Sequence, residues 1–214
     1  MADDALTRAP QNERWLTLAI PPGIETGVAS NRERISDIAL RLFAARGYEG
    51  VGVQEIVTAV GVTKPTLYHY FGSKKGLLHS LLEERLEPFT DRLRAAAETE
   101  DDLPLALNRS TRAFFQFSAA NPELYRLLLA LGSAPAESEA AQVFAPFAKS
   151  WSDLLEALFA AASNPRVRTR ASQLAATFLG MTNTWIALGL QGRATLDEEL
   201  TFQAVHQFMH GIYA

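Results

Sequence analysis

Apolar residues recur every three or four positions along most of this chain, which is the spacing of one buried helix face. The clearest stripe consists of Val53, Ile56, Val57 and Val60. Gly61 follows it directly. Because glycine adopts the left-handed conformation without a Cβ clash, we expect Gly61 to end this helix and turn the chain sharply.

A second short helix is predicted just beyond that turn. Thr63 can cap its first turn through the hydroxyl, and Pro65 is acceptable there because the first turn needs no proline N–H. Leu67 and Phe71 then lie on the buried side of this helix. Two short helices joined by a glycine turn form a helix-turn-helix pattern.

Longer helical patterns flank this pair. A preceding helix is predicted from Ser30 to Arg46, since Ser30 and Glu33 form a capping box. A long helix is predicted over residues 74–97, with Pro88 as the position at which it could bend. Further helices are expected over residues 104–120, 122–131, 137–162, 166–190 and 197–213. No segment shows the alternation of a strand, so we expect an all-α fold.

Length and composition limit the classes of protein to which this chain can belong. With 214 residues and 48% apolar content, the chain can build a substantial core. No apolar run approaches the ~18 residues of a membrane span, and no signal peptide is recognisable, so we expect a cytoplasmic protein that does not enter a membrane. The absence of cysteine excludes disulfides, thiol redox sensing and thiolate zinc sites. Residues 1–29 hold several prolines and little periodicity, and we interpret them as a flexible arm with a short helix around residues 15–20.

The outward side of the second short helix carries a distinctive mixture of side chains. A cation, a hydroxyl, a phenol and an imidazole are expected to face solvent on Lys64, Thr66, Tyr68 and His69. In a major groove, lysine can reach guanine or phosphate, threonine can contact a thymine methyl, and tyrosine and histidine can donate to phosphate. Lys74 begins the next helix, which Ser73 can cap; a cation there opposes the helix dipole, and a phosphate would compensate for this.

The charge distribution agrees with a nucleic-acid surface. Residues 32–80 carry seven cations and four anions, a net charge of +3, although the whole chain carries −4. One basic face on an otherwise acidic chain is expected where that face meets a polyanion.

Residues 38–78, which include RLFAARGYEGVGVQEIVTAVGV and TKPTLYHYFGSKKGLL, closely resemble the DNA-binding domain of the tetracycline-repressor (TetR) family. The resemblance covers residues 30 to 82. It implies a helical homodimer that binds a palindromic operator in double-stranded DNA through this domain and a small-molecule inducer through the rest. It also implies DNA contacts by Thr63, Lys64, Pro65, Thr66, Tyr68, His69 and Lys74.

Two positions depart from the family pattern. Family members usually carry Thr or Ser where this chain has Val51 and Gly52, so the hydroxyl that would cap the first short helix and contact a phosphate is missing. A backbone N–H of Gly52 or Val53 is expected to take over the phosphate contact. Lys75 stands where the family usually has an acid, which adds a positive charge beside the expected phosphate site.

The last two predicted helices are rich in apolar residues with heptad spacing. Leu174, Phe178, Met181, Trp185, Leu188, Val205, Phe208, Met209 and Ile212 form these stripes. One interpretation is a helical hairpin buried within the monomer. Because a symmetric dimer would present two recognition helices one DNA turn apart, we assign them instead to a four-helix dimer interface.

The middle of the chain carries an excess of aromatic residues, which would serve as core or as the lining of an effector pocket. The candidate lining residues are Phe114, Phe115, Phe117, Tyr125, Phe144, Phe147 and Trp151. Polar anchors for a ligand are available at Asn108, Arg112, Gln116, Arg126 and Asn183. Such a pocket would take a lipophilic or aromatic effector.

The sequence thus predicts an arm (1–29), a three-helix DNA-binding domain (30–80) and a larger helical domain for effector binding and dimerisation (81–214). The expected function is that of a homodimeric repressor released from a palindromic operator by its effector. The alternatives are an activator of the same fold, and a helical ligand- or protein-binding module that has lost DNA binding. No nucleophile motif or phosphate loop appears, and His206 and His210 lack a third metal ligand, so we expect neither an enzyme nor a cofactor or metal site.

Overall fold

The computed structural model describes residues 30–98 and 102–213, with side chains described as far as residue 210. This part of the chain is helical and contains no strand. The first four helices are α1 (Asn31–Arg46), α2 (Val53–Val60), α3 (Lys64–Phe71) and α4 (Lys74–Ala97). The others are α5 (Leu103–Ala120), α6 (Pro122–Gly132), α7 (Glu139–Ala160), α8 (Pro165–Arg168), α9 (Ala171–Leu190) and α10 (Glu198–Tyr213). The arm and the short helix expected at 15–20 lie outside the described residues.

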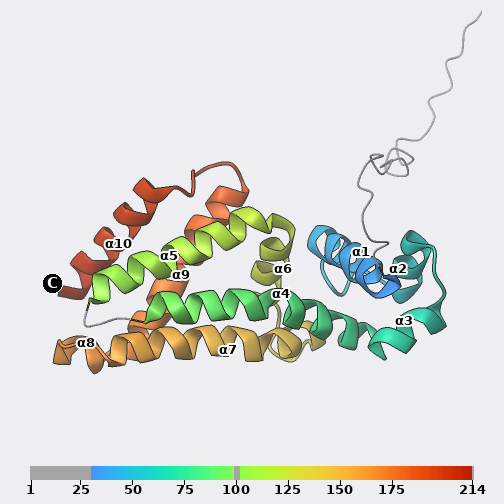
Figure 1. Ribbon diagram of the computed structural model, residues 1–214, viewed down its shortest axis with the longest axis horizontal. Helices are drawn as coiled ribbons and strands as arrows, with labels where there is room; N and C mark the ends of the chain where they lie inside the picture. Colours follow the sequence, from blue (N-terminus) through green and yellow to red (C-terminus); the bar gives the residue numbers. More distant parts are fainter. Residues whose placement is uncertain (1–29, 99–101, 214) are drawn as a thin grey trace, which may run out of the picture.

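Helices α1 to α3 form a small unit at one end of the molecule (Figure 1). The predicted capping box is present at the start of α1. The Ser30 hydroxyl accepts from the Glu33 amide at 3.3 Å, and the Ser30 amide donates to the Glu33 carboxylate at 2.8 Å. Gly61 ends α2 with φ 78° and ψ 35°, the left-handed conformation that glycine allows. Leu67 is fully buried, and it anchors α3 on this unit.

Helix α4 connects the small unit to the larger domain and is continuous through Pro88. The proline ring provides no N–H, so the carbonyl of Glu84 lacks its usual helical donor. Just before this point, α4 holds α1 through two ion pairs. Arg32 pairs with Glu84, and Arg85 lies 2.5 Å from Asp37.

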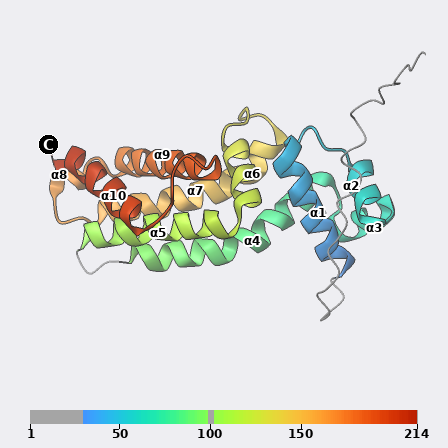
Figure 2. The same ribbon diagram turned by 90° about the horizontal axis from the view of Figure 1, so that it is seen from above.

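The larger domain is a helical bundle in which α4 lies between α5 and α7, with α9 behind them (Figures 1 and 2). Helix α10 crosses α5, and α6 joins the bundle to α1. Phe89 of α4 occupies the centre of the core. Its ring stacks on Phe117 with centroids 4.2 Å apart and meets the edges of Phe114 and Trp151 at 5.0 and 5.2 Å.

One predicted helix is wrong. The sequence pattern indicated a single helix over residues 166–190, but the chain forms the short α8, turns at Thr169 and Arg170, and begins again as α9. The cause is local. The Asn164 side chain caps α8 by accepting from the Arg166 amide at 2.9 Å, and the Arg168 guanidinium donates to the Ala162 carbonyl at 3.1 Å, which folds this turn back on the end of α7.

None of the helices in residues 30–98 and 102–213 combines the length and the apolar character that crossing a membrane requires.

Candidate nucleic-acid interface and internal cavity

Helix α3 presents the predicted chemistry to solvent. Lys64, Pro65, Tyr68 and His69 are exposed, and Thr66 is half-buried. Tyr68 is 45% exposed, which is uncommon among the large hydrophobic side chains of the described residues, whereas Leu67 and Phe71 on the opposite side are buried. Figure 1 places α3 at the end of the molecule remote from α8 and α10, so the exposed face is open to a large partner.

Thr63 does not cap α3 as the sequence suggested. No side-chain cap bond forms; instead the Thr63 and Thr66 hydroxyls lie 2.9 Å apart and bond to each other. The two hydroxyls therefore restrain one another on the outer face of α3, and the one that accepts in this bond keeps its own hydrogen for an acceptor brought by a ligand.

The start of α2 is uncapped by any side chain, as its sequence implies. Gly52 is exposed and extended, with φ −91° and ψ 152°, and half-buried Val53 follows it. Because α2 has no side-chain acceptor at this end, its first backbone N–H groups are available to an anion.

Lys74 is held in place by an aromatic ring. Its ammonium nitrogen lies 3.9 Å from the centre of the Tyr48 ring, a cation–π geometry. The Ser73 hydroxyl caps the same helix end by accepting from the Gly76 amide at 2.9 Å. Lys74 thus begins α4 in a fixed position beside α3.

Tyr48 also connects the small unit to α7, a contact that the sequence did not reveal. Its hydroxyl donates to the carboxylate of Glu139, the first residue of α7. Burial, and then the bond to Glu139, raise the pKa of Tyr48 above its ordinary value, so the phenol keeps the proton that makes this bond. The two partners are 91 positions apart, and no local pattern could pair them.

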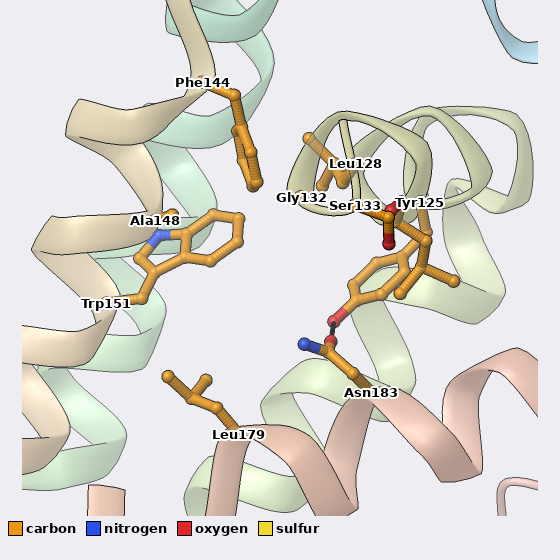
Figure 3. A pocket seen from close by; sticks show the side chains of 10 residues that line it. Tyr125, Leu128, Gly132, Ser133, Phe144, Ala148, Trp151, Leu179 and Asn183 are labelled. Atoms are coloured by element: carbon orange, nitrogen blue, oxygen red, sulfur yellow. Dashed lines mark hydrogen bonds between the residues drawn. The ribbon is translucent and has the colours of Figure 1, made fainter. Parts of the chain in front are cut away.

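A cavity of about 290 Å³ lies between α6, α7 and α9 (Figure 3). Its lining consists of Tyr125, Leu128, Leu129, Gly132, Ser133, Phe144, Ala148, Trp151, Leu179 and Asn183. Three predicted aromatic residues, Tyr125, Phe144 and Trp151, are therefore brought together around it. The Tyr125 hydroxyl donates to the Asn183 side-chain oxygen at 2.7 Å, and burial raises the pKa of Tyr125 above its ordinary value.

Four predicted lining residues lie elsewhere. Phe114, Phe115 and Phe117 are buried in the core and do not line this cavity. The rings of Phe114 and Phe117 pack against Phe89 of α4 instead. Phe147 is half-buried beside His79 at 6.1 Å. Gly132 and Ser133 also line the cavity, which the sequence did not predict. In the sequence they indicated only a break between two helices, but their small side chains at the end of α6 leave room for the cavity.

The predicted dimer residues face inward more than expected. Leu174, Phe178 and Val205 are buried within the single chain and pack in its own core, so they leave little surface for a second copy; their assignment to an interface stays a prediction. The heptad seam of α9 faces its own bundle, as the Phe178 and Phe208 rings at 5.5 Å illustrate. Met181, Trp185, Leu188, Phe208 and Met209 are half-buried, and the side chain of Ile212 lies outside those described.

A different face of the last two helices is exposed. On α9 it includes the small residues Ala176, Thr177, Gly180 and Thr184, with Gln173 one turn before them. On α10 it includes Phe202, which is 64% exposed and stacks on His206 at 5.8 Å. His206 and His210 lie 2.9 Å apart through their Nε2 atoms, and no group of three metal-ligating side chains occurs among the described residues.

Comparison with known proteins gives a consistent result for the N-terminal unit. Residues 35–81 match the family model described as bacterial regulatory proteins, tetR family. The chain is 34% identical over 90 residues to the HTH-type transcriptional activator FasR of Mycolicibacterium smegmatis, a match covering 42% of this chain and 41% of that protein. It is 39% identical over 74 residues to the HTH-type transcriptional repressor KstR2 of Rhodococcus jostii, covering 34% of each. The chain spans less than half the length of either relative.

Similar solved structures extend over nearly the whole fold. The TetR family transcriptional regulator PfmR from Thermus thermophilus has a TM-score of 0.63 and 24% identity, and covers 85% of this chain and 96% of that one. The fatty acid degradation regulator FadR from Bacillus halodurans has a TM-score of 0.68 and 22% identity, covering 87% and 98%. At these identities the likeness concerns the fold, and it confirms the all-α prediction of a helix-turn-helix domain followed by a larger helical domain. The matched relatives are named as transcriptional regulators, in agreement with the expectation of a regulator rather than an enzyme.

Proposed function

Since this chain belongs to the tetR family of bacterial regulatory proteins, we propose that it is a homodimeric repressor that leaves a palindromic operator when a small apolar effector binds. The observation that carries this proposal is the exposed face of α3. Lys64, Tyr68 and His69 project from a helix whose other side is buried, which is what a recognition helix needs in a major groove.

Two recognition helices are needed for a palindrome, and the exposed face of α9 and α10 offers a surface for a second copy. Gly180 and its small neighbours would allow two α9 helices to approach closely, and Phe202 would bury its exposed ring in the contact. Two copies related by a two-fold axis would then present their α3 helices roughly 34 Å apart, one turn of DNA, or a multiple of that distance.

The contact between Tyr48 and Glu139 provides a route from effector to DNA. Helix α7 lines the cavity with Phe144 and Trp151, and its first residue bonds the phenol on whose ring Lys74 rests. A ligand that shifts α7 would therefore act on Lys74, and on α4 as a whole, through direct contacts. The repressed and released states would differ in the spacing of the two recognition helices.

Selection of bound sequences from random double-stranded DNA tests this function. A selected palindrome would support an operator and a two-fold symmetric dimer together. Enrichment of a single half-site would contradict the dimer, and a library that stays random under conditions in which the protein remains folded would favour a module that has lost DNA binding. A reporter fused to the selected site would then distinguish repression from activation, which matters because the matched relatives include both an activator and a repressor.

Replacing Lys74 with alanine is expected to weaken operator binding about tenfold and to lower its dependence on salt. Each phosphate contact by a cation contributes roughly 0.9 to the slope of log K against log salt, so a dimer that loses two should change by about two. Binding isotherms at several salt concentrations measure both effects. Lys149, an exposed residue of α7 paired with Asp153 at 2.7 Å, provides a matched control, since Lys149→Ala should change neither. An unaltered slope in Lys74→Ala would rule out its phosphate contact.

A further inference from the structure

The cavity between α6, α7 and α9 is free of charge. None of its ten lining residues is an acid, a base or a histidine. Most are aliphatic or aromatic, and only Tyr125, Ser133 and Asn183 bring side-chain polar atoms apart from the indole N–H of Trp151. An ionised ligand would therefore enter without a counter-ion, which is unfavourable in an apolar environment.

The side-chain donors of the lining already have acceptors within the protein, with one exception. Trp151 donates its indole N–H to the Thr90 hydroxyl at 2.9 Å, and the Ser133 hydroxyl donates to the Leu129 carbonyl at 3.0 Å. The Tyr125 hydroxyl donates to the Asn183 oxygen at 2.7 Å. None of these three hydrogens is free for a ligand.

The exception is the side-chain amide nitrogen of Asn183. Because the amide oxygen of Asn183 accepts from Tyr125, the NH₂ group of the same amide points away from Tyr125. In Figure 3 this nitrogen points across the cavity, on the side of Leu179 and Trp151. An amide nitrogen is a donor only, so the group it can bind is a hydrogen-bond acceptor.

We propose that the effector is an uncharged, compact apolar molecule that carries a carbonyl acceptor, such as a ketone, an ester or an amide, and that Asn183 binds this carbonyl. This inference rests on the proposed function, because it names the ligand of the same regulatory cavity. The rings of Phe144 and Trp151 would pack against the apolar body, and a volume of about 290 Å³ suits a molecule with one ring or a short chain. Tyr125 acts as a positioning residue, since its bond fixes which side of the Asn183 amide faces the ligand.

Three probes of nearly equal shape separate the possibilities. They are 4-phenylbutan-2-one, which has a carbonyl; 3-methylbutylbenzene, which has none; and 3-phenylpropanoate, which is an anion. Binding to the full chain in the absence of DNA can be followed by calorimetry and by the rise in melting temperature. We expect the ketone to bind about tenfold more tightly than either of the others, the size of effect that one buried hydrogen bond produces.

Variants of the lining test the role of Asn183. Asn183→Leu combined with Tyr125→Phe should reduce ketone affinity about tenfold to the level of the hydrocarbon, whose own affinity should stay the same or rise; the second change removes the phenol hydrogen that Asn183→Leu alone would leave free to donate. Ser133→Ala, which removes a lining hydroxyl that is not assigned to the ligand, should leave the preference for the ketone intact. Tyr125→Phe alone should weaken ketone binding less than the double variant, since it releases the amide without removing it.

Several results would overturn the inference. Equal affinities for ketone and hydrocarbon in the wild type would remove the role of the carbonyl, and tighter binding of 3-phenylpropanoate would indicate an anion site. Binding of none of the three by folded protein would exclude the cavity as a site for compact neutral carbonyl compounds. The wild-type comparison requires no variant to fold. It is also independent of the operator selection, so failure here and failure of DNA binding can be told apart.

Discussion

Replacing Gly180 with arginine is expected to leave the chain folded, to produce monomers and to lower operator affinity by about a hundredfold or more. The first expectation follows from the space around this glycine. A Cβ built on Gly180 meets no atom within 4 Å, so a longer side chain would extend into solvent from a single copy. A helical glycine also destabilises its helix by about 1 kcal/mol relative to alanine, and the substitution removes that penalty.

The second expectation follows from the proposed contact between two copies. An arginine at the closest approach of two α9 helices would separate them and place two like charges together. Binding two half-sites through one dimer gains roughly 10² to 10⁴ in affinity over one half-site, and a monomer loses this gain. Sizing chromatography with light scattering measures the assembly state, and a binding isotherm on the selected operator measures the loss.

The control for this experiment lies on a different helix. Ala157 is an exposed residue of α7, and Ala157→Arg adds the same side chain away from α9 and α10. It should remain dimeric and bind the operator normally. A dimeric Gly180→Arg with full affinity would place the interface elsewhere. Trp185 is less suitable for this test, because it packs against the core of its own chain and a change there confounds stability with assembly.

Replacing Phe89 with alanine is expected to lower the free energy of unfolding by about 3–5 kcal/mol. Phe89 is 1% exposed and contacts the rings of Phe117, Phe114 and Trp151, so its loss leaves a cavity where α4, α5 and α7 meet. The surrounding helices can collapse only partly around such a cavity, since each is also held by its other neighbours.

Denaturant unfolding at one fixed protein concentration measures this change, because assembly would otherwise contribute to the apparent stability. Leu105→Ala is the control: Leu105 lies on α5 but is 43% exposed, so its loss should cost less than about 1 kcal/mol. A similar cost for both variants would mean that the aromatic cluster around Phe89 does not dominate the core.

Features encoded by neighbouring residues were predictable from the sequence. The capping box of Ser30 and Glu33, the cap by Ser73 and the left-handed Gly61 each involve residues a few positions apart, and the structure contains all three. The outward face of α3 was predictable for the same reason, because Leu67 and Phe71 determine which side is buried. What these exposed side chains bind stays a prediction.

Features that depend on packing between distant segments were not predictable. The stripe of Leu174 and Phe178 was correctly read as one apolar face of a helix, but periodicity does not tell whether that face meets its own core or a second chain. Periodicity also could not tell whether the phenylalanines of α5 line a pocket or fill the core. The structure shows Phe117 stacked on Phe89 in the core. The bond between Tyr48 and Glu139 joins segments that only the complete fold brings together.

The position of Pro88 implies a mechanical property of α4. The ion pairs to α1 occur at Glu84 and Arg85, just before the proline. The contacts with the aromatic core of the larger domain are made by Phe89, just after it. We therefore expect the first half of α4 to move together with the DNA-binding unit, limited by the contact of His79 with Phe147 of α7. The missing backbone hydrogen bond at Glu84 makes a bend at Pro88 less costly. With a rise of 1.5 Å per residue, Lys74 lies about 21 Å from Pro88, so a rotation of about 5° would carry it about 2 Å, enough to separate an ammonium group from a phosphate.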